Sequence, residues 1–202
     1  LGAFKLNKHS FFFAANGFVR DIKDRIGRPL SSQINNDIQV LGFVNQGNAK
    51  SKGFDFEFNY TFNNNFNLSF NTSKLELTTL NRYNVKTPLP NEPFLTINVG
   101  ANYMFKDVIA KKSQLNVFYS YLFVDTFNFL FLVGANLAGA DFFDVPQQNI
   151  HDIGLSYVFP NKKFIASFDA KNITNRQVYD NMGVQKPGRA FYFKLNYVFN
   201  NF

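Results

Sequence analysis

Apolar and polar residues alternate one by one along several segments of this chain. In residues 54–62 every second residue is Phe or Tyr, and the residues between them are Asp, Glu, Asn and Thr. A similar alternation runs through 95–105, 153–159 and 191–199. A period of two is typical of β-strands with one apolar and one polar face, because successive side chains point to opposite faces. The pattern therefore predicts an all-β chain.

Each alternating segment ends in the same short phrase, a Tyr and a Phe separated by one residue. The phrase recurs every 40 to 54 residues, which fits two strands with one long and one short connection, the hairpin period of a membrane barrel. Aromatic residues at one height are typical of the interfacial girdle of such barrels. We predict that the girdle at the periplasmic rim comprises Tyr60, Phe62, Tyr103, Phe105, Tyr157, Phe159, Tyr197 and Phe199.

Return strands fill the intervals between these segments. With an incoming strand at 1–6, the chain has about nine strands; the return strands are 10–25, 66–80, 114–127 and 164–173. The apolar phase of 66–80 shifts after Thr72, which predicts either a bulge or a strand that continues beyond the membrane. Short connections (7–9, 63–65, 106–112, 160–163) alternate with long ones (26–37, 81–93, 129–149, 174–188). In barrels of this class, short turns face the periplasm and long loops face outside. Bacterial barrels normally have an even number of strands, so an odd count predicts that the chain is incomplete.

Composition separates this prediction from a soluble β-sandwich, whose strands also alternate. The chain has 28 Phe and 9 Tyr yet a mean hydropathy of −0.18, and apolar faces about ten residues long suit a tilted membrane strand. The most apolar stretch, 127–140, is too short for a spanning helix. The net charge of +7 comes from lysines and arginines scattered over turns, which favours anionic lipid over nucleic acid as a partner.

The sequence contains no catalytic constellation. It lacks cysteine, and its two histidines, His9 and His151, are predicted at opposite rims, which argues against a shared metal site. The stretch 134–140 lacks the Lys and Ser/Thr of a phosphate-binding loop. We therefore predict no enzyme activity, no bound metal and no cofactor.

Three stretches resemble the TonB-dependent receptors of the outer membrane. The first is Gly17–Ile26, and the second is Asn45–Ala49 followed by Gly53–Glu57. The most specific is the end, where Phe168-Asp169-Ala170-Lys171-Asn172-Ile173-Thr174-Asn175 precedes Lys186-Pro187-Gly188-Arg189-Ala190-Phe191-Tyr192. Asp55 stands where the family often has Glu.

The resemblance implies that residues 1–202 are the C-terminal part of a transmembrane antiparallel β-barrel of 22 strands in a Gram-negative outer membrane. It also implies an importer of a scarce nutrient, first of all an iron-siderophore or haem complex, energised through the TonB complex. The plug domain and the segment that contacts TonB are not among these residues. Expected partners are that plug, outer-membrane lipid and lipopolysaccharide, the ferric chelate or haem, and a surface lipoprotein.

Cargo contacts are expected in the outer loops, where cationic and aromatic groups suit an anionic chelate or a planar ring. The candidates are Arg28, Arg82, Tyr83, Lys86, Phe142, Phe143, Gln147 and Gln148; as alternatives, they are solvated or bind lipopolysaccharide phosphates. In the lumen, Asp55, Glu57, Asp169 and Lys171 are expected to form a wall against the plug. Other cargoes of the family are glycans, peptides or cobalamin. Outside the family, a passive porin or a small barrel adhesin or enzyme fits the strand pattern.

Overall fold

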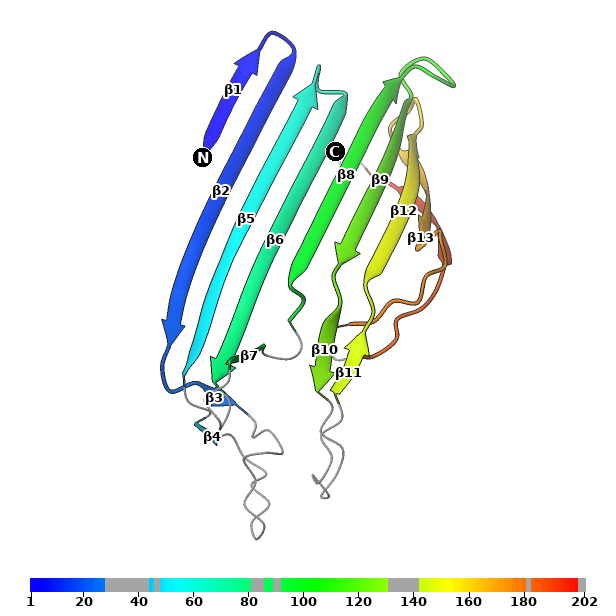
Figure 1. The fold of residues 1–202 in the computed structure, drawn as a ribbon. Coiled ribbons are helices and arrows are strands. Elements are labelled where there is room, and N and C mark those ends of the chain that lie inside the picture. Colours follow the sequence, from blue (N-terminus) through cyan, green and yellow to red (C-terminus); the bar gives the residue numbers. More distant parts are fainter. Residues whose placement is uncertain are drawn as a thin grey trace.

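A single curved sheet of antiparallel strands makes up most of the molecule (Figure 1). The computed structural model describes residues 1–27, 44–45, 48–80, 86–88, 92–130, 142–180 and 183–199. Nine strands follow one another in the sheet in chain order: β1 (Gly2–Leu6), β2 (His9–Ile22), β5 (Ala49–Phe62), β6 (Phe66–Leu80), β8 (Leu95–Lys106), β9 (Gln114–Val124), β12 (Gln148–Val158), β13 (Phe164–Lys171) and β14 (Ala190–Tyr197).

The connections alternate in length as the sequence predicts. Short turns join the strands at one end of the sheet, the upper end in Figure 1, and long connections lie at the other. The long connections carry three small additions: β7 (Lys86–Pro88), which pairs with β6, and the two-stranded pairs β3 (Ile26–Gly27) with β4 (Val44–Asn45) and β10 (Phe127–Leu130) with β11 (Phe142–Val145). The nine-strand meander is thereby confirmed.

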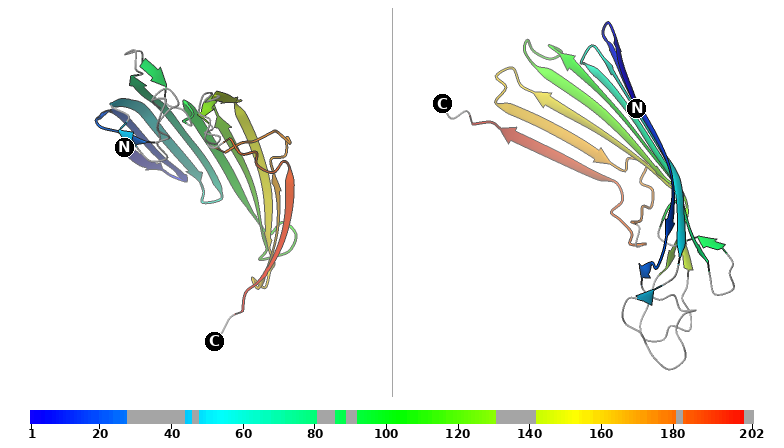
Figure 2. Two further views of the ribbon diagram at one scale, coloured as in Figure 1. Left: turned by 90° about the horizontal axis from the view of Figure 1, so that it is seen from below. Right: turned by 90° about the vertical axis from the view of Figure 1, so that its left-hand side faces the viewer.

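Figure 2 shows the sheet as a curved, open wall that does not close on itself within the described residues. Neighbouring strands pair only along the chain order, and β1 and β14 are the two edges. This is the geometry of a segment of a β-barrel wall.

The strand register is continuous, so one residue parity stays on one face throughout. β5 pairs with β6 from Phe62 opposite Phe66 to Ala49 opposite Thr79 without a slip, and β6 pairs with β8 equally regularly. The bulge considered after Thr72 is therefore absent from these pairings. β6 instead continues past the end of β8 and pairs with β7, which fits a strand that extends beyond the apolar band.

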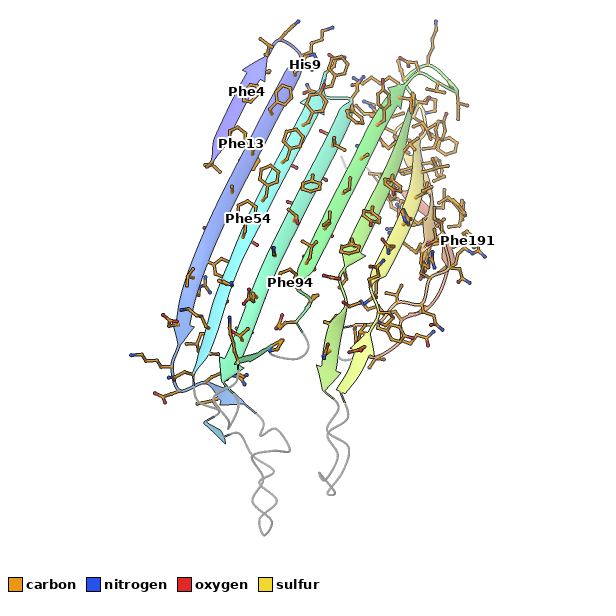
Figure 3. All side chains as sticks on the ribbon, viewed as in Figure 1. Phe4, His9, Phe13, Phe54, Phe94 and Phe191 are labelled. Atoms are coloured by element: carbon orange, nitrogen blue, oxygen red, sulfur yellow. The ribbon has the colours of Figure 1, made fainter. Side chains whose placement is uncertain are left out.

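The two faces of the sheet differ in chemistry. Figure 2 shows the curvature of the sheet, and Phe4, Phe13 and Phe54 lie on its convex face (Figure 3). By register, that face carries most of the aromatic and aliphatic residues of the long strands. Large apolar side chains on it are exposed, such as Phe193 at 74%. The concave face carries mainly polar and small residues of the other parity.

Apolar side chains buried in the interior are few. Among the described residues, the buried hydrophobic side chains are Ala49, Phe127, Val145, Ala170 and Val178. A soluble sandwich would bury its alternating Phe and Leu residues against a second sheet, whereas here they form one contiguous exposed surface of the kind that contacts lipid. None of the described residues belongs to a helix with the length and apolarity needed to cross a membrane.

The height of the apolar face matches a bilayer. On β8 the face runs from Leu95 to Phe105, ten residue steps, or about 33 Å along the strand. At the tilt of about 40° usual in membrane barrels, this length covers about 25 Å across the membrane, the height of the apolar band of such barrels. One strand of this sheet is therefore long enough to cross the hydrocarbon layer.

Asparagine residues form the tight short turns. Asn7, Asn63 and Asn64 have φ angles of 53°, 50° and 56°, in the left-handed region that asparagine tolerates better than most residues. The turn at 63–65 is closed by the Asn65 amide, which donates to the Phe62 carbonyl at 3.0 Å. These turns reverse the chain in two or three residues and keep the aromatic residues at the ends of adjacent strands close together.

Gly154 in β12 leaves room for the ring of its cross-strand partner. Phe118 of β9 lies directly opposite, and a Cβ added at Gly154 would lie 1.8 Å from Phe118 Cζ. We expect Gly154→Ala to reduce the free energy of unfolding by about 1–3 kcal/mol, because the ring must leave its position on the concave face. Urea titration of the whole receptor in lipid vesicles measures the loss.

Gly17→Ala is the matched control for this substitution. A Cβ at Gly17 would meet nothing closer than the Gly53 carbonyl oxygen at 4.0 Å, so we expect a change within about 0.5 kcal/mol. Adding Phe118→Leu to Gly154→Ala should recover part of the loss. Equal stability of the two alanine variants would contradict the cross-strand packing.

Candidate functional site

The concave face contains a polar wall between β2, β5, β6 and β8. A cavity of about 360 Å³ opens there, and its lining includes Asn16, Asp55, Glu57, Ser73 and Asn98. The Ser73 hydroxyl donates to Asp55 Oδ1 at 2.6 Å, and the side-chain amide of Asn59 donates to Glu57 Oε1 at 2.6 Å. Both carboxylates are thus held by short hydrogen bonds on strands, and the wall offers fixed acceptors to whatever fills the concave side.

The four lumen residues expected in one wall belong to two separate groups. Asp55 and Glu57 lie together on β5. Lys171 lies on β13, where its Nζ donates to Asp152 Oδ2 at 3.1 Å, and Asp169 is two residues before it. The partner of Lys171 is therefore Asp152 of β12, a residue that the sequence reasoning did not select.

Asp152 also fixes the end of β13. Its Oδ1 accepts a hydrogen bond from the backbone amide of Asn172 at 2.7 Å, and the backbone amide of Ile173 donates to the His151 carbonyl at 2.9 Å. Asn172 is buried and has a φ of 48°. The chain therefore leaves the sheet in a defined direction immediately after Lys171.

The side chain of Asn172 closes the next four residues into a turn. Its Nδ2 donates to the Arg176 carbonyl at 2.7 Å, and its Oδ1 accepts from the Arg176 amide at 3.0 Å. Asn175 then holds the other end of the loop, since its Oδ1 accepts from the Arg189 amide at 3.0 Å. A Cβ at Gly188 would lie 2.8 Å from the same Oδ1, which explains a glycine there. The two asparagines and the Pro-Gly-Arg sequence are thus parts of one loop anchor.

A small buried cluster lies at the loop end of β12. Phe127 and Val145 pair across β10 and β11, are buried at 6% and 4% exposure, and have Val124 and Tyr179 packed against them. The Tyr179 amide donates to Gln148 Oε1 at 2.8 Å. The connection between β13 and β14 is therefore held against the β10–β11 hairpin. Sequence periodicity could not indicate this contact, because it joins separate loops.

The predicted cargo residues are distributed over several connections. Arg28, Arg82 and Tyr83 lie outside the described residues, and Phe142 and Phe143 lie in β11. Lys86 is exposed on β7 and its Nζ donates to Glu76 Oε1 at 3.1 Å. Gln147 is exposed between β11 and β12, whereas Gln148 is 2% exposed and its carbonyl is occupied by Tyr179. The predicted cargo residues that the structure describes all lie at the end of the sheet that carries the long connections.

The aromatic residues at the opposite end contact one another both across strands and along them. Phe11 and Tyr60 have ring centroids 4.9 Å apart, Tyr103 and Phe105 4.4 Å, and Phe164 and Tyr197 4.8 Å. Further pairs join Tyr157 to Phe159 and Tyr197 to Phe199. The register places these rings on the convex face at the end of the short turns. The sequence reasoning did not select Phe11 and Phe164, which lie opposite Tyr60 and Tyr197.

The two histidines occupy separate positions on the convex face. His9 begins β2, and its Nδ1 is 2.7 Å from the Tyr60 hydroxyl. His151 lies inside β12, where its Nδ1 is 2.7 Å from the Tyr119 hydroxyl. Within the described ranges, no group of three or more His, Cys, Asp or Glu side chains could hold a metal ion.

A curved antiparallel meander with a lipid-facing convex side, a polar concave side and long loops at one end defines a segment of an outer-membrane β-barrel wall. The family profile described as TonB dependent receptor-like, beta-barrel, matches residues 2–174. The chain belongs to this family. Its members are transporters of the Gram-negative outer membrane rather than enzymes, and that membrane is the location of this chain.

Solved structures share the fold. The FrpB iron transporter from Neisseria meningitidis (F3-3 variant) matches with a TM-score of 0.68 and 14% identity, over 96% of this chain and 30% of that one. The ferripyoverdine receptor of Pseudomonas aeruginosa gives 0.66 and 16%, over 94% and 25%. The copper transporter OprC gives 0.64 and 16%, over 98% and 30%. The chain thus spans about a quarter to a third of these structures. No curated protein matches it by sequence.

Proposed function

We propose that residues 1–202 form the C-terminal part of the barrel of an active importer, which takes up an iron-siderophore or haem complex and is energised through the TonB complex. The observation that carries the proposal is the membership of the TonB-dependent receptor family, with a wall whose register places most apolar residues on one face and most polar residues on the other. The iron and siderophore transporters among the structures with the same fold support this choice of cargo.

The concave wall is proposed to contact the plug domain of the same receptor. Asp55 and Glu57 are held by Ser73 and Asn59 and present acceptors toward the concave side. Such pre-oriented carboxylates suit amide, hydroxyl or guanidinium donors of a folded domain. Asp169 and Lys171 contribute a second contact further round the wall.

Cargo is proposed to bind at the end of the long connections, which faces outside because short turns of such barrels face the periplasm. Among the described residues, Lys86 and Gln147 are exposed there. Cationic and aromatic side chains of the neighbouring connections, Arg28, Arg82, Tyr83, Phe142 and Phe143, are proposed to join them. The loop anchor at Asn172 would hold one side of this mouth in place, with Gln148 as part of the support.

Deletion of the gene that encodes this chain tests the cargo. We expect the deletion strain to lose uptake of at least one radioactive ferric siderophore, or of haem, under iron limitation, and to recover it with the complete gene on a plasmid. Vitamin B12 and a copper chelate serve as comparison cargoes. Unchanged uptake of every iron complex tried, with loss of a comparison cargo instead, would remove the iron proposal and leave the family membership standing.

A further inference from the structure

The convex face changes from aromatic to cationic toward the long connections. Phe54 of β5 lies opposite Lys74 of β6, and two residues further on Lys52 lies opposite Glu76. The register is unbroken, so these lysines point to the same side as Phe54, which is the lipid side. Because the apolar band ends at Phe54, the lysines are at the height where the headgroups of the outer leaflet begin.

A groove accompanies these lysines on β2, β5 and β6. It has a volume of about 500 Å³ and is lined by, among others, Gly17, Val19, Lys52, Phe54, Lys74 and Phe94. Gly17 lies opposite Phe54 and has no side chain to fill the space beside it. Val19 is 68% exposed and Phe54 47%, so the floor of the groove is open apolar surface (Figure 3 labels Phe54 and Phe94).

The charges around the groove leave an excess of cations. Glu76 binds Lys52 at 2.8 Å and Lys86 at 3.1 Å, and Asp21 binds Lys50 at 3.5 Å. Lys74 lies over the ring of Phe94, with its Nζ 4.9 Å from the ring centroid. Among the residues that the structure describes, four lysines therefore meet two carboxylates, and Lys74 is positioned by an aromatic ring rather than by a carboxylate.

The geometry points to a binding site for a phosphorylated lipid, and we propose that its occupant is the lipid A part of lipopolysaccharide. A phosphate would lie between the Nζ atoms of Lys52 and Lys74, and an acyl chain would follow Val19 and Phe54 down onto the apolar face. Free phosphate would use only the lysines, whereas the groove combines cations with an apolar floor. The height of the groove, at the loop end of the strands, selects the outer leaflet, where lipid A lies.

Binding of lipid A to the purified complete receptor tests this site. Bis-phosphorylated lipid A, its dephosphorylated form and inorganic phosphate are titrated in detergent, and the bound lipid is counted by native mass spectrometry. We expect Lys52→Gln with Lys74→Gln to weaken binding of phosphorylated lipid A roughly 10- to 30-fold, since each lysine near an anionic lipid surface contributes about a factor of five. Dephosphorylated lipid A should bind the unaltered receptor as weakly as phosphorylated lipid A binds the double variant.

Two further variants are expected to change binding in different ways. Glu76→Gln should strengthen binding of phosphorylated lipid A, because it releases Lys52 and Lys86 from their carboxylate. Lys162→Gln with Lys163→Gln removes two lysines from a short turn at the opposite end and should leave binding unchanged. Three results would overturn the site. The first is an unchanged affinity for phosphorylated lipid A in the Lys52/Lys74 double variant, and the second is a weaker affinity in Glu76→Gln. The third is displacement of bound lipid A by millimolar inorganic phosphate as effectively as by added lipid A. Heat-modifiable migration on gels confirms that each variant is folded.

Discussion

Val99→Lys is expected to destabilise the folded receptor in a bilayer by about 2–4 kcal/mol, the cost of a lysine near the midplane of a membrane barrel. Val99 lies on β8, between Phe70 of β6 and Tyr121 of β9 in the same row of the convex face. Its side chain therefore contacts hydrocarbon, where an ammonium group loses its hydration without gaining a partner. Urea titration of the complete receptor in lipid vesicles, followed by tryptic protection, measures the change.

Asn98→Lys provides the matched control at the adjacent position. Asn98 lies on the concave face and lines the polar cavity with Asp55 and Glu57, so a lysine there gains carboxylate neighbours. We expect its effect on stability to stay within about 0.5 kcal/mol. If both lysine variants lost the same stability, the assignment of the two faces to lipid and lumen would fail, and with it the transport proposal.

The assignment of residues to the two faces of the sheet could be predicted from the sequence, because side chains of a strand alternate between faces with a period of two residues. In β5 the alternation of Phe and polar residues states directly which side chains share a face, and the unbroken register confirms it. The same rule holds for β8, β12 and β14. The Tyr-x-Phe phrase gave the strand ends, since it precedes the short turns after β5, β8 and β12.

The shift of apolar phase in β6 shows where this rule needs the structure. Leu75 and Leu77 have the parity of the concave face, and the convex parity carries Lys74 and Glu76 at the same height. Two explanations fitted the sequence, a bulge or a strand that leaves the membrane. Only the pairing with β5, β7 and β8 decides between them. The change of chemistry marks the end of the apolar band.

The loop anchor was beyond the reach of periodicity for a different reason. The side chains of Asp152 and Gln148 accept hydrogen bonds from backbone amides 20 and 31 residues away, and no spacing rule connects such positions. The family resemblance drew attention to Asn172, Asn175 and the Pro-Gly-Arg sequence without a physical reason. The structure supplies that reason, because Asn172 binds Arg176 and Asn175 binds Arg189, and both bonds close the base of one loop.

Asn172→Ala is the second substitution with a large expected effect. It removes both side-chain bonds to Arg176 and places alanine at a φ of 48°, which together cost about 2–4 kcal/mol of local stability. The connection between β13 and β14 should then open while the sheet stays intact. We expect amide exchange at Arg176 and Tyr179 to accelerate at least 30-fold, with exchange in β8 and β9 unchanged.

Two companion variants separate strain from lost hydrogen bonds. Asn172→Gly keeps the left-handed backbone at little cost but lacks the side chain, so it should show an intermediate acceleration. Asn161→Ala also removes an asparagine that binds a backbone amide, that of Lys163 at 3.0 Å, but in an exposed short turn at the other end. It should leave exchange at Arg176 unaltered. If Asn172→Ala exchanged no faster than Asn161→Ala, Asn172 would not anchor the loop, and the mouth of the barrel would need another support.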